Sequence, residues 1–301
     1  AECRFLAAYY WYLLTDTYGA IPYRPNFIAP SDSDLESLKV GQIPYYQIID
    51  DLDQEFLAVS KLLPATYSDG RKYGRATSIM CLAIRARMLV FAASPLVNGN
   101  SDYASFVNRS GEQLFSTSYD PSRWTRAKQA CKELIDAAEA AGHKLYEVKN
   151  SDGRIDPFAS VQYAMLARAD QGNKEILFAR PGGCDYSDYE KHCTPVVGGG
   201  NVGWGVTQSL VDAFFMENGL PITDPASGYV ESGFSTADEV RGYDWEVEYN
   251  DDKVTAAGTY NMYCHREPRF YTTISFNNAW FCSEKRRYDF LMNGDDNHHT
   301  H

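Results

Sequence analysis

The sequence predicts a mainly α-helical protein with an irregular, loop-rich second half and a few short strands. Stretches before residue 180 repeat apolar residues at helical spacing, and a proline or glycine follows each long one. Residues 180–265 are instead rich in Gly, Tyr, Asp, Asn and Ser. We therefore expect one domain, with a helical scaffold over residues 1–179 and a loop-rich, aromatic-rich part over residues 180–301.

The long helices follow from their apolar periodicity and from the residues that end them. They are expected over residues 2–18, about 44–63, 72–94 and 122–142. Gly19, Pro64, Pro95 and Gly142 supply the stop signals. The third helix carries a continuous apolar stripe that has to be buried against neighbouring helices. Helix pairs of this length stack as a solenoid, although a strict repeat of about 34 residues is not visible.

Shorter elements are expected farther along the chain. A helix begins near Phe158, and another spans residues 209–218. The apolar run at residues 173–179 has the density of a buried strand. Alternation of Phe270, Ile274 and Phe276 with polar neighbours predicts a short strand within residues 266–276.

Charge and hydropathy narrow the class of partner. The net charge of −12 and a pI near 5.0 repel phosphate backbones, which argues against a nucleic-acid ligand. No run of roughly 18 uncharged apolar residues is present to span a bilayer. The chain begins within a helical pattern and ends without a closing element, so we expect it to be an internal part of a longer protein.

The seven cysteines do not predict a metal site. They are scattered and include no C-x-x-C pair, which a zinc site would favour. Cys184 and Cys193 bracket a short polar loop, and the sequence leaves open whether they pair. We expect no metal and no cofactor.

Four segments, taken in order, resemble a known family. They are RFLAAYYWYLL leading to YGAIPY within residues 4–23, GRAT leading to ASPLVNG within 74–99, NKEILFA at 173–179 and REPRFYTTI at 266–274. Their order and spacing resemble the SusD/RagB family of outer-membrane nutrient-binding lipoproteins. The stretch from Trp204 to Gly219 is also similar to the family pattern, whereas Glu267 stands where the family usually has Asp.

The resemblance implies a fold, a location and a partner. The family would have a tetratricopeptide-like helical scaffold that carries a loop-rich ligand-binding part. It would be a lipid-anchored protein of the outer-membrane surface, and its partner would be a TonB-dependent channel of the SusC/RagA type. The implied function is non-catalytic capture of oligosaccharides for that channel. Oligopeptide capture by the same family, an intracellular helical-repeat scaffold that binds another protein and, last, a hydrolase with two facing carboxylates are the alternatives.

Aromatic residues in the loops are the candidate ligand contacts. Sugar rings present apolar faces that pack on Trp or Tyr, while amides bind the hydroxyl groups. The expected contacts are Tyr186, Tyr189, Tyr243, Trp245 and Trp280, with Asn277 and Asn278 as hydrogen-bonding neighbours. Trp280 is the first choice because it follows a strand end in a polar loop. Trp204 is expected to pack inside the protein.

Other motifs have simpler explanations. Residues 198–203 match G-x-G-x-x-G, but no βαβ unit surrounds them, so a dinucleotide site is not expected. The histidines lack a Ser or Cys nucleophile in a recognisable elbow, and no catalytic residue is predicted. Arg266 and Arg269 are expected to form structural ion pairs with Glu267 or other local carboxylates.

Overall fold

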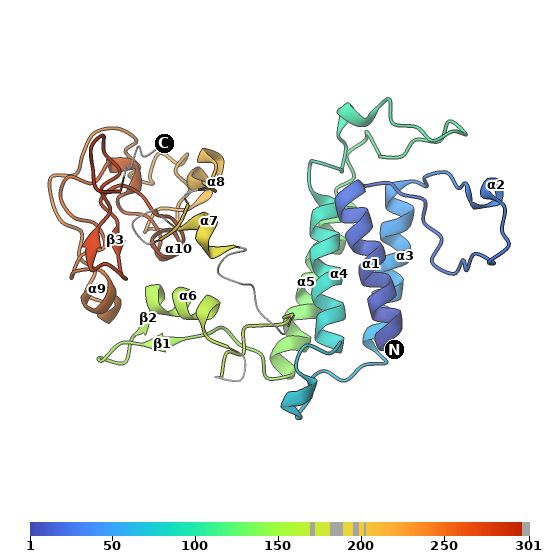
Figure 1. Cartoon of the computed structure of the whole chain (residues 1–301), viewed down its shortest axis with the longest axis horizontal. Coiled ribbons are helices and arrows are strands. Elements are labelled where there is room, and N and C mark those ends of the chain that lie inside the picture. The colour runs from blue at the N-terminus through green and yellow to red at the C-terminus, as the bar shows by residue number, and fades with distance from the viewer. Residues whose placement is uncertain (169–171, 181–188, 195–198, 202, 297–301) are drawn as a thin grey trace. The chain divides into compact units, whose positions relative to one another are not determined.

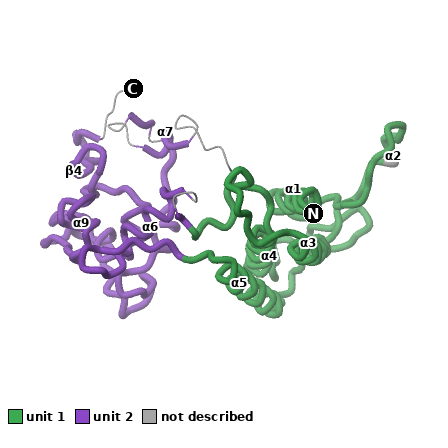
Figure 2. The backbone as a smooth tube through the Cα atoms, turned by 90° about the horizontal axis from the view of Figure 1, so that it is seen from below, with its two compact units in different colours: residues 1–144, 174–181 green, residues 145–173, 182–301 purple. Residues whose placement is uncertain are grey.

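The computed structural model describes residues 1–168, 172–180, 189–194, 199–201 and 203–296. Figure 1 traces the chain, and Figure 2 colours its two compact units. The first unit contains residues 1–144 and 174–181, and the second contains residues 145–173 and 182–301. Residues 145–173, which precede the boundary expected at residue 179, thus group with the second unit.

The first unit is a layer of long helices. Its elements are α1 (Glu2–Tyr18), α2 (Leu35–Leu38), α3 (Tyr45–Ser60), η1 (Gly70–Lys72), α4 (Ser78–Ala93), η2 (Ser101–Tyr103) and α5 (Ser122–Ala140). Helix α4 packs against both α3 and α5, and α1 packs against α3. The four long helices lie side by side in Figure 1. The helices predicted from periodicity are therefore confirmed, with ends that differ by a few residues.

Helix α4 shows how the sequence sets its own boundaries. The Thr77 side chain accepts a hydrogen bond from the Met80 backbone N–H at 3.1 Å and so caps the first turn. The helix stops at Ala93, because the residue before Pro95 is pushed into extended backbone. Apolar residues occur almost all round the helix, and both its α3 and α5 faces are buried.

A buried ion-pair network crosses the helices of the first unit. Asp53 on α3 pairs with Arg85 on α4 and with Arg126 on α5. Arg85 also pairs with Glu133 on α5 at 2.6 Å. Asp53 and Arg85 are each less than one-tenth exposed, so each charge depends on its partners for compensation.

The second unit consists of short elements joined by long loops. They are β1 (Val148–Lys149), β2 (Ile155–Asp156), α6 (Pro157–Leu166), α7 (Glu190–Cys193), α8 (Gln208–Ala213), α9 (Asp244–Tyr249), η6 (Asn261–Tyr263), α10 (Pro268–Thr273), β3 (Trp280–Phe281) and β4 (Arg286–Arg287). The strands form two antiparallel pairs, in which Val148 faces Asp156 and Trp280 faces Arg287. Helices α6 and α10 pack together at the centre of the unit.

Two predicted strands are wrong. The segment expected as a strand at 266–276 contains helix α10, in which Pro268 takes the first helical position. Phe270 and Ile274 are four residues apart, so they lie on one side of this helical turn and its C-cap, and both are buried. Among the described residues of 173–179, none lies in a strand.

Candidate functional site

The second unit contains a cleft of about 280 Å³ between α6, α9, α10 and the β3–β4 hairpin. Its wall combines aromatic, aliphatic and uncharged polar side chains. The lining residues are Val161, Gln162, Met165, Leu166, Trp245, Tyr249, Asn250, Val254, Tyr271, Thr272, Thr273, Ile274, Ser275, Phe276, Ala279, Trp280, Cys282 and Tyr288. A small-molecule site commonly combines an apolar wall with a few polar groups in this way.

Asp156 places the first wall of the cleft. Its Oδ1 accepts hydrogen bonds from the backbone N–H groups of Phe158 and Ala159, both at 3.0 Å, and thereby starts helix α6. Its Oδ2 accepts the backbone N–H of Trp245 at 3.1 Å. Because Asp156 is only 1% exposed, one buried carboxylate joins the beginnings of α6 and α9.

Trp245 closes the cleft from α9. It is 6% exposed and stacks on Phe158, with ring centroids 4.8 Å apart. Its indole N–H donates to the Gln162 side-chain oxygen at 2.5 Å. One turn later, Tyr249 shares a hydrogen bond with Tyr163, which raises the pKa of Tyr249.

Tyr271 anchors the α10 side of the cleft. Its hydroxyl donates to the Tyr263 carbonyl oxygen at 2.9 Å, accepts the Arg266 backbone N–H at 3.0 Å and lies 3.3 Å from Glu239 Oε2. Burial raises the pKa of Tyr271 well above its ordinary value, so the hydroxyl remains protonated. These contacts orient the residues that follow it, among them the exposed Thr273.

Trp280 lies on β3 at the edge of the cleft and is partly exposed. The Arg287 guanidinium carbon lies 5.8 Å from its ring centroid. Arg287 donates to backbone carbonyl oxygens, including that of Asn278 at 2.8 Å. Within the described part of the chain, no hydrogen bond engages the Trp280 indole N–H.

The structure brings together two of the predicted contact residues, Trp245 and Trp280, at this cleft. Asn277 and Asn278 do not line it. The Asn277 side-chain oxygen accepts the Phe290 backbone N–H at 2.7 Å, and the Asn278 amide donates to Thr259 Oγ1 at 2.8 Å. Both amides therefore hold the hairpin in place.

Tyr243 also lies outside the lining of the cleft. It is half-buried, its ring lies 5.8 Å from that of Phe158, and Arg154 approaches its face at 5.3 Å. Tyr186 falls outside the described residues, as does Cys184.

Tyr189 belongs to a separate exposed cluster. Its ring meets that of Trp204 edge to face at 5.2 Å, and His192 stacks on Trp204 at 5.3 Å. Trp204 is 51% exposed, so the expectation that it packs inside the protein is wrong. The backbone N–H of Trp204 donates a hydrogen bond to the His192 carbonyl oxygen at 3.0 Å. This bond holds Trp204 beside α7, with its indole at the surface.

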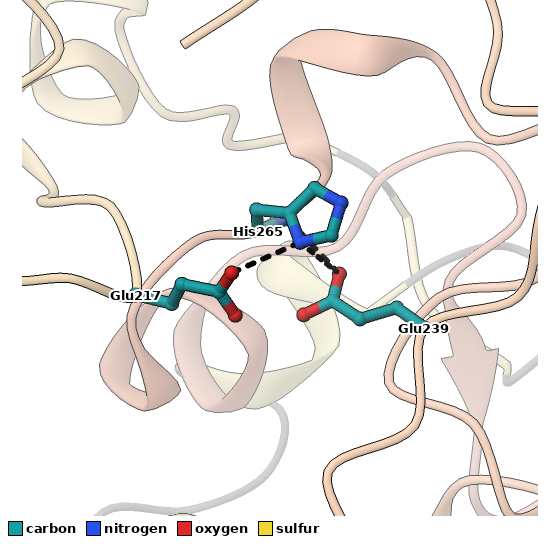
Figure 3. A group of neighbouring side chains, drawn as sticks. All are labelled: Glu217, Glu239 and His265. Carbon is teal, nitrogen blue, oxygen red and sulfur yellow. Dashed lines mark hydrogen bonds and ion pairs between the residues drawn. The ribbon is translucent and has the colours of Figure 1, made fainter. Parts of the chain in front are cut away.

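Glu217, Glu239 and His265 converge outside the cleft (Figure 3). Both carboxylates approach Nδ1 of His265, Glu217 at 3.1 Å and Glu239 at 3.9 Å. Arg241 forms ion pairs with both carboxylates, and Glu239 Oε2 also accepts the backbone N–H of His265 at 2.9 Å. The Arg241 guanidinium already supplies the positive charge that a metal ion would bring to the two carboxylates. The network also joins three loop segments.

The two arginines of the 266–274 segment have structural roles of different kinds. Arg269 pairs with Glu267 at 2.6 Å, as predicted. Arg266 is fully buried and donates instead to the carbonyl oxygens of Val211 and Phe214 at 2.6 and 2.9 Å, beside the end of α8. Positive charge at a helix C-terminus is stabilising, so the carbonyl oxygens at the end of α8 bind the Arg266 guanidinium in place of a carboxylate.

Sequence reasoning missed Gln162, Tyr249 and Thr273 as cleft residues. Tyr249 follows Trp245 by four residues, a spacing that places two aromatic rings on one side of a short helix. That spacing is the signal that could have found it. No comparable spacing in the sequence identifies Gln162 and Thr273, because they reach the cleft only through the packing of α6 on α10.

Comparisons with known proteins agree with this architecture. The model of the SusD family matches residues 162–298. A solved structure named BT4246 aligns with 92% of this chain at 26% identity and a TM-score of 0.68, and 49% of its own length is covered. This chain therefore spans about half the length of that structure. No curated protein matches the chain.

Two solved structures from Bacteroides fragilis NCTC 9343 have a similar fold. The SusD-like protein BF3747 aligns with 92% of this chain at 19% identity and a TM-score of 0.55, with 42% of its own chain covered. The SusD-like carbohydrate-binding protein BF0978 aligns with 95% at 17% identity and a TM-score of 0.53, with 41% covered. The fold is mainly helical and SusD-like, and residues 162–298 of the chain match the SusD family.

Proposed function

We propose that this protein is a non-catalytic binding protein that captures an oligosaccharide in the cleft of its second unit. The observation that carries the proposal is the partly exposed Trp280 ring at the edge of a cleft that also presents uncharged hydrogen-bonding groups. A sugar ring would stack on the indole face opposite Arg287. The structural neighbour BF0978 is described as a carbohydrate-binding protein, which is consistent with this class of ligand.

Hydrogen-bonding groups around the cleft complete the proposed site. The oxygen of Gln162 is engaged by Trp245, whereas its amide N–H groups have no partner within the described residues. The Thr273 hydroxyl is likewise without a hydrogen-bond partner in that part of the chain and is exposed. These donors would bind sugar hydroxyl groups, and the partly exposed ring would bind the apolar face.

We also propose that the protein acts at the outer-membrane surface, held there by an N-terminal lipid, and hands its ligand to a TonB-dependent channel of the SusC/RagA type. The match of residues 162–298 to the SusD family supports this location and partner. Among the described residues, no helix is both long and apolar enough to cross a membrane, and the proposed attachment by a lipid does not require one. The channel would take over the ligand after capture and occlusion.

Calorimetry with a glycan panel and a mixed peptide pool tests the proposed ligand. We expect saturable binding of a glycan whose affinity falls in Trp280→Ala and falls less in Trp280→Phe, because the phenyl ring retains a smaller stacking surface. Loss of one stacking contact corresponds to about a tenfold weaker affinity. Circular dichroism establishes that each variant is folded.

Trp204→Ala is the matched control, since Trp204 is an exposed tryptophan of the same unit outside the cleft. It should leave glycan binding unchanged. Loss of binding in Trp204→Ala with normal binding in Trp280→Ala would move the site to the Tyr189–Trp204 cluster. Binding of peptides alone would favour the oligopeptide alternative and contradict the proposed ligand class.

A further inference from the structure

The wall of the cleft is free of formal charge. None of the described residues that line it is Asp, Glu, Lys, Arg or His. The whole chain has 23% charged residues, so a random set of this size would include about four. The contrast is sharp in a protein with a net charge of −12. The side chains of the wall thus offer a ligand hydroxyl, amide, thiol, aromatic and aliphatic contacts, and none that carries a formal charge.

The titratable groups of the wall also stay neutral at neutral pH. Burial raises the pKa of Tyr271 and Tyr288, and the hydrogen bond with Tyr163 raises that of Tyr249. The Cys282 thiol lies 3.3 Å from the Tyr249 carbonyl oxygen, in the position of a hydrogen-bond donor. None of these groups therefore supplies an anion that could receive a cationic ligand.

Arg287 is a charged group that approaches the wall through its contact with the Trp280 ring. Glu239 and Arg241 also contact a lining residue, Tyr271, and they pair with each other. The N–H groups of Arg287 point to backbone carbonyl oxygens, at 2.8 Å for Asn278, 3.5 Å for Asn250 and 3.4 Å for Lys253. Asp251 lies 3.8 Å away and balances its charge. A carboxylate or sulfate in the cleft would lose water without gaining a free guanidinium.

The volume limits the ligand further. At about 280 Å³, the cleft lies at the lower end of small-molecule sites, which hold roughly 300–1,000 Å³. It therefore has room for one sugar ring and little more, so the rest of an oligosaccharide would lie outside. Met165 and Leu166 line the cleft with exposed side chains.

We propose that the cleft selects one uncharged ring of a neutral glycan and excludes rings that carry carboxylate, sulfate or phosphate groups. The inference rests on the proposed function, since it specifies the class of glycan bound at the same site. It also excludes the charged ends of a free peptide, because the wall offers no counter-charge for an ammonium or a carboxylate group.

Paired ligands test the selectivity. A neutral oligosaccharide that binds in the panel is compared by calorimetry with the same oligosaccharide whose primary hydroxyl groups are oxidised to carboxylates. We expect the anionic form to bind about tenfold more weakly or worse, since its charge would be desolvated without a partner. Equal or tighter binding of the anionic form overturns the inference but leaves glycan capture intact. Absence of binding to every neutral and anionic glycan refutes the proposed function itself.

A charge placed in the wall should reduce the preference for the neutral glycan. Thr273 is exposed at the cleft, so Thr273→Lys adds a cation with little effect on folding. We expect affinity for the oxidised glycan to rise about two- to fivefold, the range for a solvent-exposed ion pair. Thr236→Lys places the same charge at an exposed loop position away from the lining and should not change the ratio. Equal effects of both variants would contradict a neutral wall as the source of selectivity.

Discussion

Trp245 and Trp280 line the same cleft, but their rings have different surroundings. Trp245 is 6% exposed, stacks on Phe158 and uses its indole N–H within the protein. Trp280 is partly exposed and keeps its N–H without a partner among the described residues. A residue such as Trp245 shapes the wall, whereas one such as Trp280 can contact a ligand. The two predicted contacts thus have separable roles at the scale of the single residue.

Truncation of Trp245 should reduce stability. Trp245→Ala removes a buried ring and leaves a cavity beside Phe158, so we expect the free energy of unfolding to fall by about 3–5 kcal/mol. Denaturant unfolding followed by circular dichroism measures the change. Trp280→Ala serves as the comparison and should lower the free energy of unfolding by much less. Similar losses in the two variants would contradict the assignment of Trp280 to ligand contact.

At the scale of the element, charged groups determine how neighbouring segments meet. Asp156 begins α6 and also binds the backbone of α9, so the cleft depends on one capping residue. In the first unit, Asp53 and Arg85 connect α3 with α4, and Glu133 extends the network along α5. Hydrogen bonds from Gln129 and Arg85 lower the pKa of Glu133 below its ordinary value.

The lowered pKa of Glu133 predicts a pH dependence of stability. Because the folded state holds the carboxylate ionised, Glu133 stabilises the protein above its unfolded pKa of about 4.3. This contribution is lost as the pH falls through the lower folded pKa. The difference in unfolding free energy between wild type and Glu133→Gln should therefore reach its largest value near neutral pH and vanish in acid.

Denaturant titrations at a series of pH values measure that difference. Glu139→Gln is the control, since Glu139 lies exposed on the same helix. A difference for Glu133→Gln that is constant with pH, or one that grows in acid, would contradict the role of the ionised carboxylate. A matching profile for Glu139→Gln would show that helix charge in general is responsible.

At the scale of the whole molecule, the long helices and the proposed ligand cleft belong to different units. Long helices with one shared core form the first unit, while the cleft lies within the second. The proposed channel partner would therefore recognise a surface that does not require an intact cleft. Glycan binding and channel binding should be separable by mutation.

Copurification tests this separation. A tagged form of the protein, recovered from detergent-solubilised outer membranes of the cells that make it, should carry a TonB-dependent channel identified by mass spectrometry. Trp280→Ala should retain the channel although it binds the glycan more weakly. Recovery of wild type without any such channel, from cells in which the glycan is imported, would refute the proposed partner.

The helices of the first unit could be predicted because their signals are local. Apolar residues at three- and four-residue spacing, with Gly19, Pro64 and Pro95 near the ends, specify each helix within a few residues. The same reasoning misread α10, where Phe270 and Ile274 are four residues apart, a spacing that fits both periods. Short segments take their structure from packing, and α10 packs against α6, which lies about a hundred residues earlier.

The sequence by itself determined the helical class, the resemblance to the SusD family and the wealth of aromatic residues in the loops. The tertiary structure alone decided which of those residues share a cleft. Trp245, Trp280 and Gln162 meet there because α6, α9 and the β3–β4 hairpin pack together, although they are far apart in the chain. Exposure likewise distinguishes buried Trp245 from exposed Trp204. The type of a residue determines which contacts its side chain can make. Long-range packing determines which side chains remain available to a ligand.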